Sequence, residues 1–135
     1  MVKLKHQLMY MRIAESVAET SSSKRLKVGS VIVKNNNIIS TGYNALPAFL
    51  DGSLEDELGN TKPETRHSEK NALLALVKSN ESSLGSILFC THSCCKFCSI
   101  DIIDAGIKTV YYRTEYRDTE GLDYLRQNDV EVIKI

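Results

Sequence analysis

Hydrophobic residues recur at helical spacing near the start of this 135-residue chain. From position 4 to about 18, apolar side chains stand three or four residues apart, and a polar run at 20–23 then breaks the pattern. This period predicts a first helix. The other predicted helices run from about 66 to 78, from 95 to about 104 and from 120 to 127. Gly106 follows the third of these stretches as a typical C-cap.

Five short runs rich in β-branched and aromatic residues are typical of strands, at 28–33, 38–43, 86–91, 108–112 and 130–135. The first two flank a run of three asparagines, and because asparagine tolerates positive φ, the run predicts the turn of a β-hairpin. The later strands alternate with helices, which indicates parallel crossovers with helices on both faces of a sheet. The predicted fold class is α/β, a three-layer α/β/α arrangement around a central mixed sheet of about five strands.

The segment 51–65 has no hydrophobic period. It is polar and acidic, and it contains Gly52, Gly59 and Pro63. Such a composition favours an exposed excursion between the hairpin and the second helix.

Length and composition limit what the chain can be. With 42% hydrophobic residues, 135 residues suffice for one domain with a core, so residues 1–135 are predicted to form a single domain. Seventeen basic and seventeen acidic residues give a net charge of zero, which disfavours a nucleic-acid partner. No apolar run approaches the roughly 20 residues that span a bilayer, and no signal peptide is recognisable. We therefore expect a cytoplasmic protein with no membrane partner.

Two short motifs carry the candidate chemistry, His67-Ser68-Glu69 and Cys95-Lys96-Phe97-Cys98, each where a helix is predicted to begin. Cys95 and Cys98 are three residues apart, so in the first turn of a helix both sulfurs can reach one metal ion. The positive end of the helix dipole and the metal both favour the thiolate form. His67 and Glu69 can converge over the end of the other helix. All four cysteines of the chain fall between positions 90 and 98, unlike those of a disulfide-stapled fold.

One histidine and two cysteines fit a catalytic zinc site, which keeps a fourth position open, whereas a structural site usually has four protein ligands. Glu69 is then free to move protons. A His-x-Glu motif followed by Cys-x-x-Cys is the signature of zinc nucleobase deaminases. Each half alone has a plainer interpretation: Cys-x-x-Cys also occurs in structural zinc and redox sites, and His-x-Glu at ordinary polar helix starts. Both motifs together, each after a predicted strand, favour the deaminase.

The chain closely resembles the deoxycytidylate (dCMP) deaminases of the cytidine deaminase-like superfamily, including phage-type members. The resemblance runs through the segments 27–33, 39–44, 67–72, 95–98, 105–108 and 121–125. It implies a cytidine deaminase-like fold and zinc-dependent hydrolytic deamination of dCMP to dUMP and ammonia, which supplies dUMP for thymidylate synthesis. The location it implies is the cytoplasm, that of the host if the protein is viral.

The same resemblance assigns roles to single residues. His67, Cys95 and Cys98 would bind one catalytic Zn²⁺ per chain, and Glu69 would be the proton shuttle. The substrate's base and sugar would be held by the side chain of Asn44, the backbone N–H of Ser68 and the carbonyl of Ser93. The 5′-phosphate is expected near a Ser/Lys-rich turn, which is also typical of a plain solvated loop. The candidates there are Ser22, Ser23, Lys24, Arg25 and Lys27, with Tyr116 and Arg113 further along the chain.

Regulation and assembly are also implied by the resemblance. A homo-oligomer, a hexamer or a dimer, is expected, with dCTP as activator, dTTP as inhibitor and Mg²⁺ accompanying the triphosphate. Lys78 falls near the effector and interface residues of regulated members, although a lysine at a helix C-terminus also has a plain dipole role.

Three features depart from the family pattern. Cys94 stands where proline is usual, which leaves Cys94 and Cys95 as rival first ligands, and the x-x spacing favours Cys95 with Cys98. Ser68 stands where alanine is common. The segment 51–65 contains no Cys or His, so the additional zinc site of some larger members is expected to be absent. Two other functions stay open: deamination of another cytosine or adenine nucleoside, nucleotide or tRNA base, and a non-catalytic nucleotide-binding zinc protein.

Overall fold

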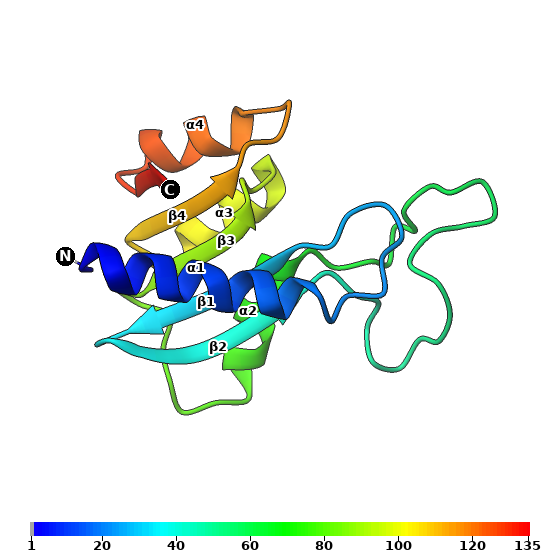
Figure 1. Cartoon of the computed structure of the whole chain (residues 1–135), viewed down its shortest axis with the longest axis horizontal. Helices are drawn as coiled ribbons and strands as arrows, with labels where there is room; N and C mark the ends of the chain where they lie inside the picture. The colour runs from blue at the N-terminus through cyan, green and yellow to red at the C-terminus, as the bar shows by residue number, and fades with distance from the viewer. Residues whose placement is uncertain (1) are drawn as a thin grey trace.

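A five-stranded mixed sheet forms the centre of the molecule, in a computed structural model that describes residues 2–135 (Figure 1). The elements are α1 (Leu4–Ala18), β1 (Gly29–Lys34), β2 (Asn37–Tyr43), α2 (Ser68–Val77), β3 (Ile87–His92), α3 (Lys96–Asp104), β4 (Thr109–Thr114), α4 (Glu120–Gln127) and β5 (Glu131–Lys134). The strand order is β2-β1-β3-β4-β5. β1 is antiparallel to β2 and β3, and β3, β4 and β5 are parallel. The predicted α/β class with a mixed five-stranded sheet is confirmed.

The asparagine run makes the predicted hairpin turn between β1 and β2. Asn35 and Asn36 both have positive φ, 50° and 61°, and Lys34 pairs with Asn37 across the two-residue turn. Two successive positive φ values are typical of the type I′ turn, whose twist matches that of the flanking strands. Asparagine adopts this conformation more readily than other residues with a side chain, so the local sequence is sufficient to place the turn.

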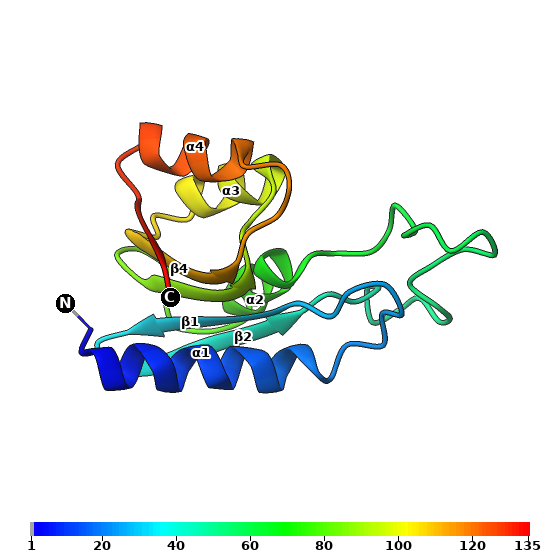
Figure 2. The same ribbon diagram turned by 45° about the horizontal axis from the view of Figure 1, so that its top comes forward.

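Helices cover both faces of the sheet, as predicted (Figure 2). α3 and α4 connect successive parallel strands in one direction across the sheet, and right-handed crossovers of this kind lie on the same face. α1 supplies the cover of the opposite face. Successive side chains of β1 point to opposite faces of the sheet. On one face, Val31 and Val33 pack with Met11 of α1, and on the other face, Ile32 packs with Ala72 of α2.

The prediction that the segment 51–65 is exposed is wrong for two of its residues. The segment between β2 and α2 projects beyond the sheet beside the α1–β1 connection (Figures 1 and 2), and most of its side chains are exposed. Leu54 and Glu55, however, are only 3% and 6% exposed. The Glu55 carboxylate is buried because it accepts hydrogen bonds from the turn at 23–25, about thirty residues away in sequence. A contact between residues so far apart in sequence cannot be predicted from a local pattern.

Candidate active site

The N-termini of α2 and α3 meet at one point and bring together His67, Cys95 and Cys98. His67 is the N-cap of α2, and Cys95 is the N-cap of α3, both in extended backbone conformation. His67 Nδ1 lies 3.3 Å from Cys98 Sγ and 3.5 Å from Cys95 Sγ. All three candidate ligand atoms lie within 4.8 Å of one another. The convergence inferred from the two motifs is therefore present in the fold.

These separations fit a tetrahedral zinc ion. Zn–S distances near 2.3 Å and Zn–N distances near 2.1 Å place neighbouring ligand atoms about 3.5–3.8 Å apart. Among residues 2–135, the group of potential metal ligands at this place consists of His67, Cys95 and Cys98 alone. A three-ligand set leaves one tetrahedral position for water or substrate, the arrangement of a catalytic site.

Protonation of the three side chains is coupled. A hydrogen bond from the Cys98 thiol is the main reason that the pKa of Cys95 falls to about 4. The same bond, together with burial, raises the pKa of Cys98. The Cys95 thiolate in turn raises the pKa of His67 through their hydrogen bond. A negative charge and its compensating protons are thus already gathered where a cation would bind.

Cys94 is excluded from this cluster by its position. Its side chain is 1% exposed and belongs to the hydrophobic core formed by α2, α3 and α4. Burial raises the pKa of the Cys94 thiol, so it stays protonated and behaves as a small hydrophobic residue. Of the two rival first cysteines, the structure brings Cys95 to His67.

Glu69 is 4% exposed and lies on a buried polar network. Its Oε1 accepts hydrogen bonds from the Ser68 hydroxyl at 2.5 Å and from the Cys90 thiol at 3.5 Å. The Ser68 hydroxyl also bonds the Ser30 hydroxyl at 2.7 Å. Ser30 and Cys90 are register partners on β1 and β3, directly beneath the start of α2. The carboxylate is therefore held on one side by hydrogen-bond donors.

This network is not predicted by the sequence motifs. Ser68 was expected to contribute only its backbone N–H, and Ser30 was not singled out at all. The available signal was the two-residue period of strands, which places Ser30 on the same face as Ile32. That face is apolar elsewhere, so a hydroxyl there needs a polar partner in the layer above.

Two glycines allow the backbone of each site helix to approach its neighbour. A β-carbon on Gly42 would stand 2.4 Å from the carbonyl oxygen of Ser68, and one on Gly121 would stand 2.3 Å from that of Cys94. Non-bonded atoms do not approach so closely, so any side chain at these positions forces the backbone apart. Gly42 sets the approach of β2 to α2, and Gly121 sets the approach of α4 to the metal-binding turn.

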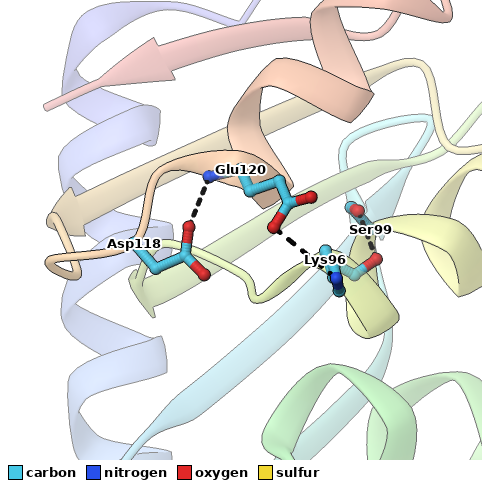
Figure 3. Close-up of polar contacts among 4 residues, drawn as sticks. All are labelled: Lys96, Ser99, Asp118 and Glu120. Atoms are coloured by element: carbon cyan, nitrogen blue, oxygen red, sulfur yellow. Dashed lines mark hydrogen bonds and ion pairs between the residues drawn. The ribbon is translucent and has the colours of Figure 1, made fainter.

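Side chains also connect α3 to α4 (Figure 3). Lys96 Nζ lies 3.7 Å from Glu120 Oε2, and this ion pair joins the two helices. The other two contacts are local: the backbone N–H of Glu120 donates to Asp118 at 2.9 Å, and the Ser99 hydroxyl donates to the Lys96 carbonyl at 2.6 Å. The ion pair is 40% exposed on one side and 44% on the other, and such pairs contribute at most about 1 kcal/mol. Close backbone packing therefore positions the two helices more than the ion pair does.

The side chains of the three residues predicted to hold base and sugar, Asn44, Ser68 and Ser93, already have hydrogen-bond partners within the protein. Asn44 Oδ1 accepts from the Val28 N–H at 2.9 Å, and its Nδ2 donates to the Leu26 carbonyl at 2.8 Å. The Ser93 hydroxyl accepts from the Tyr116 N–H at 2.9 Å. Asn44 thus fastens the backbone at 26–28, and a role toward substrate, which would use its remaining amide hydrogen and lone pair, stays a prediction.

One pocket joins three of the phosphate candidates, Ser23, Arg25 and Tyr116. Arg25 and Tyr116 line a pocket of about 420 Å³ with Ser23, Leu26 and Thr61. Burial and the nearby Glu69 raise the pKa of the Tyr116 hydroxyl. Tyr116 therefore lines the pocket beside Arg25 and is close enough to Glu69 to be affected by its charge.

Other phosphate candidates lie elsewhere. Lys27 lines a separate hollow of about 280 Å³ with Arg113, and the Arg113 guanidinium is paired with Glu15 at 3.0 Å. Ser22 and Lys24 are exposed. Lys78 is exposed at the C-terminal end of α2, the end opposite His67. The structure thus gathers only part of the predicted phosphate set in one pocket.

The chain is similar in sequence to known deaminases. The family model described as the cytidine and deoxycytidylate deaminase zinc-binding region matches residues 4–114. The deoxycytidylate deaminase of Mycobacterium phage D29 is 32% identical, over 78% of this chain and 92% of that protein. An uncharacterised deaminase of Aliivibrio fischeri is 34% identical, over 81% of this chain and 73% of that protein.

Solved structures agree with this relationship. The dCMP deaminase of the cyanophage S-TIM5, in complex with dCMP and dUMP, is 46% identical with a TM-score of 0.97, and each chain is covered completely. The deaminase and reductase protein of Thermotoga maritima is 24% identical with a TM-score of 0.77. This chain matches 36% of that protein's length, and the likeness concerns the fold alone.

Proposed function

Because the chain belongs to the zinc-binding family of cytidine and deoxycytidylate deaminases, we infer that it converts dCMP and water to dUMP and ammonia. The observation that carries this inference is the open cluster of His67, Cys95 and Cys98 beside a buried Glu69, in a chain that matches a dCMP deaminase over its full length.

His67, Cys95 and Cys98 are proposed to hold the zinc ion, which their donor set and spacing fit. When bound, zinc supplies a Lewis acid that lowers the pKa of a coordinated water toward about 7. Three ligands leave room for that water, and the buried Cys98 and half-buried Cys95 approach from the protein side. His67 is the most exposed of the three.

Glu69 is proposed to carry the protons of the reaction. It takes one proton from the attacking water and delivers it to the ring nitrogen next to the amine-bearing carbon. It then takes the second proton from the hydroxyl added to that carbon and passes it to the departing amine, which leaves as ammonia. Among the described residues, both hydrogen bonds to the Glu69 carboxylate end on Oε1. Oε2 does not take part in these two bonds, and it is the oxygen proposed to take and give the protons. A carboxylate bound to the metal could not do this work.

Recognition of the base, sugar and phosphate follows from the resemblance and is likewise proposed. The Ser68 N–H would donate to the pyrimidine carbonyl, the Ser93 carbonyl would accept from the exocyclic amine, and Asn44 would contact the sugar. The pocket lined by Arg25 and Tyr116 is the place proposed for the 5′-phosphate, since it combines a guanidinium with a hydroxyl. Lys24 and Lys27 would add positive charge nearby.

The direct test is ammonia release by the purified, zinc-assayed protein from dCMP, CMP, deoxycytidine and dCTP. Turnover of dCMP in preference to the others is expected. Turnover of deoxycytidine or CMP instead would assign another nucleoside or nucleotide substrate. One zinc per chain without turnover of any of them would favour a non-catalytic zinc protein or a tRNA-base substrate.

Assembly, regulation and location are further proposals. We propose a homo-oligomer, regulated by dCTP and dTTP with Mg²⁺, and Lys78 as a residue of the effector site, because regulated family members have these properties. The same assay with added dCTP or dTTP tests the regulation, and light scattering tests the oligomer. Among residues 2–135, no helix has the length and apolar character needed to span a bilayer. A cytoplasmic location is proposed from the family relationship.

A further inference from the structure

A buried carboxylate organises the basic turn that precedes β1. Glu55 Oε1 accepts three hydrogen bonds: from the Ser23 hydroxyl at 2.7 Å, from the Lys24 N–H at 2.9 Å and from the Arg25 N–H at 3.2 Å. Its Oε2 lies 3.4 Å from the Ser53 hydroxyl. Glu55 is 6% exposed, whereas Glu57 two residues later is exposed.

This contact changes how the turn can recognise a phosphate. Two successive backbone N–H groups and a serine hydroxyl form an arrangement that commonly binds an anion. Here the protein's own carboxylate already occupies that arrangement. A substrate phosphate would have to displace Glu55 or be bound by side chains. The side chains are available, because Arg25 lines the neighbouring pocket with Thr61 and Tyr116.

The contact also holds the backbone from which the Arg25 side chain starts. The Arg25 backbone is held by Glu55, and its Nη1 lies 3.5 Å from the Thr61 hydroxyl, on the far arm of the same projecting segment. Glu55 pairs with Thr61 in a short antiparallel bridge. One carboxylate therefore joins the 23–25 turn to the 53–61 segment and closes the pocket from two sides.

We propose that Glu55 is a positioning residue for phosphate recognition: by holding the turn at 23–25, it directs Arg25 into the pocket beside Tyr116 and so sets the preference for a nucleotide over a nucleoside. Glu55 itself does not touch the phosphate. Its carboxylate is stabilised by three neutral hydrogen-bond donors, and for this role the orientation of Arg25 must outweigh repulsion between this charge and the phosphate. The inference rests on the proposed function, since it concerns the phosphate of that substrate.

The test compares binding of dUMP and deoxyuridine by calorimetry in the zinc-loaded protein. In Glu55→Ala, the ratio of deoxyuridine Kd to dUMP Kd is expected to fall at least about tenfold, because the Arg25 backbone loses its anchor. Glu55→Gln keeps an oxygen acceptor in the same place, and it is expected to keep the ratio within about threefold. Glu57→Ala is the matched control on the same segment, expected to match the wild type.

The following results would contradict the proposed role of Glu55. Tighter dUMP binding in Glu55→Ala would overturn the proposal, because it would mean that the carboxylate competes with the phosphate. An unchanged ratio, or equal loss of both ligands, would also overturn it. If Glu55→Ala does not fold, Glu55→Asp replaces it, since an aspartate is one methylene too short to reach the turn, and it should lower the ratio. Wild-type turnover of dCMP is measured in parallel, so that failure of the proposed function is distinguished from failure of this inference.

Discussion

The hydroxyl of Ser68 donates a hydrogen bond to the carboxylate of Glu69, its neighbour in the chain, across a distance of 2.5 Å. The same hydroxyl contacts Ser30 at 2.7 Å, so Ser68 lies at the centre of a buried chain of polar groups. Adjacent residues in a helix do not normally face each other. The first turn of α2 permits it, because Ser68 and Glu69 both turn inward toward β1 and β3 there.

Replacing Ser68 by alanine should therefore lower kcat with little change in KM. The variant leaves Glu69 held by the weak Cys90 donor alone and leaves the Ser30 hydroxyl without this partner. We expect a loss of about three- to tenfold in kcat, equivalent to about 1 kcal/mol. Steady-state kinetics with dCMP check this, and Ser16→Ala, at an exposed position of α1, is the control. A rise in KM with unchanged kcat would contradict a role in holding Glu69.

Replacing Glu69 by glutamine should abolish turnover while the metal stays bound. The amide has nearly the same shape but cannot carry a proton, and loss of a general acid–base group costs about 10²–10⁴ in rate. Metal analysis and ammonia release on the same preparation are the measurements. Glu64→Gln, an exposed change on the loop before α2, should leave both unchanged. Wild-type activity in Glu69→Gln would refute the assigned proton shuttle.

The two neighbouring cysteines should respond differently to substitution. Cys94→Ala is expected to keep one zinc per chain and to destabilise the fold by about 1–2 kcal/mol, because it leaves a small void in the core. Cys95→Ala is expected to lose zinc, because two ligands remain. Metal content and urea unfolding separate the two effects. Retention of zinc in Cys95→Ala, with loss in Cys94→Ala, would reverse the assignment.

Gly121→Ala should displace the turn at Cys94 and Cys95, which packs against the start of α4. The added β-carbon would lie 2.3 Å from the Cys94 carbonyl oxygen and 2.8 Å from that of Cys95, so α4 or the turn must move. We expect a loss of about 1–3 kcal/mol in unfolding free energy and weaker zinc retention against a chelator. Gln127→Ala, exposed at the other end of α4, is the control. Unaltered zinc retention in Gly121→Ala would show that the turn is positioned by other contacts.

The Glu55 contact should make stability depend on pH in a defined direction. The hydrogen bond from Ser23 is the main reason that the pKa of the Glu55 carboxyl is lowered on folding. As pH falls, the unfolded chain takes up the proton first, near pH 4.3. The contribution is therefore complete above that pH and is lost as pH falls through the lower folded value. Urea unfolding of the wild type and Glu55→Gln should give a difference that is constant from pH 7 to about 5.5 and shrinks below. A difference that grows on acidification would show the opposite shift.

Local pattern was sufficient for much of this protein. The helical period at 4–18, the paired asparagines at 35 and 36 and the glycine at 106 each predict structure that the chain adopts. The two motifs at His67 and Cys95 each lie at a predicted helix start, and their combined signature predicts one shared zinc ion. The contact itself joins segments 28 residues apart and is made by the fold. Parallel crossovers then follow from the alternation of strands and helices.

Tertiary structure alone decided the contacts between segments far apart in the chain. Glu55 resembles any acid of a polar loop, and Ser30 resembles any serine of a strand, until the fold places them beside Ser23 and Ser68. The close approach of Gly121 to Cys94 likewise cannot be predicted from the residues around position 121. The physical reason is common to all three. Burial of a polar group or close approach of two backbones depends on which partner lies opposite, and that is set by packing of the whole chain.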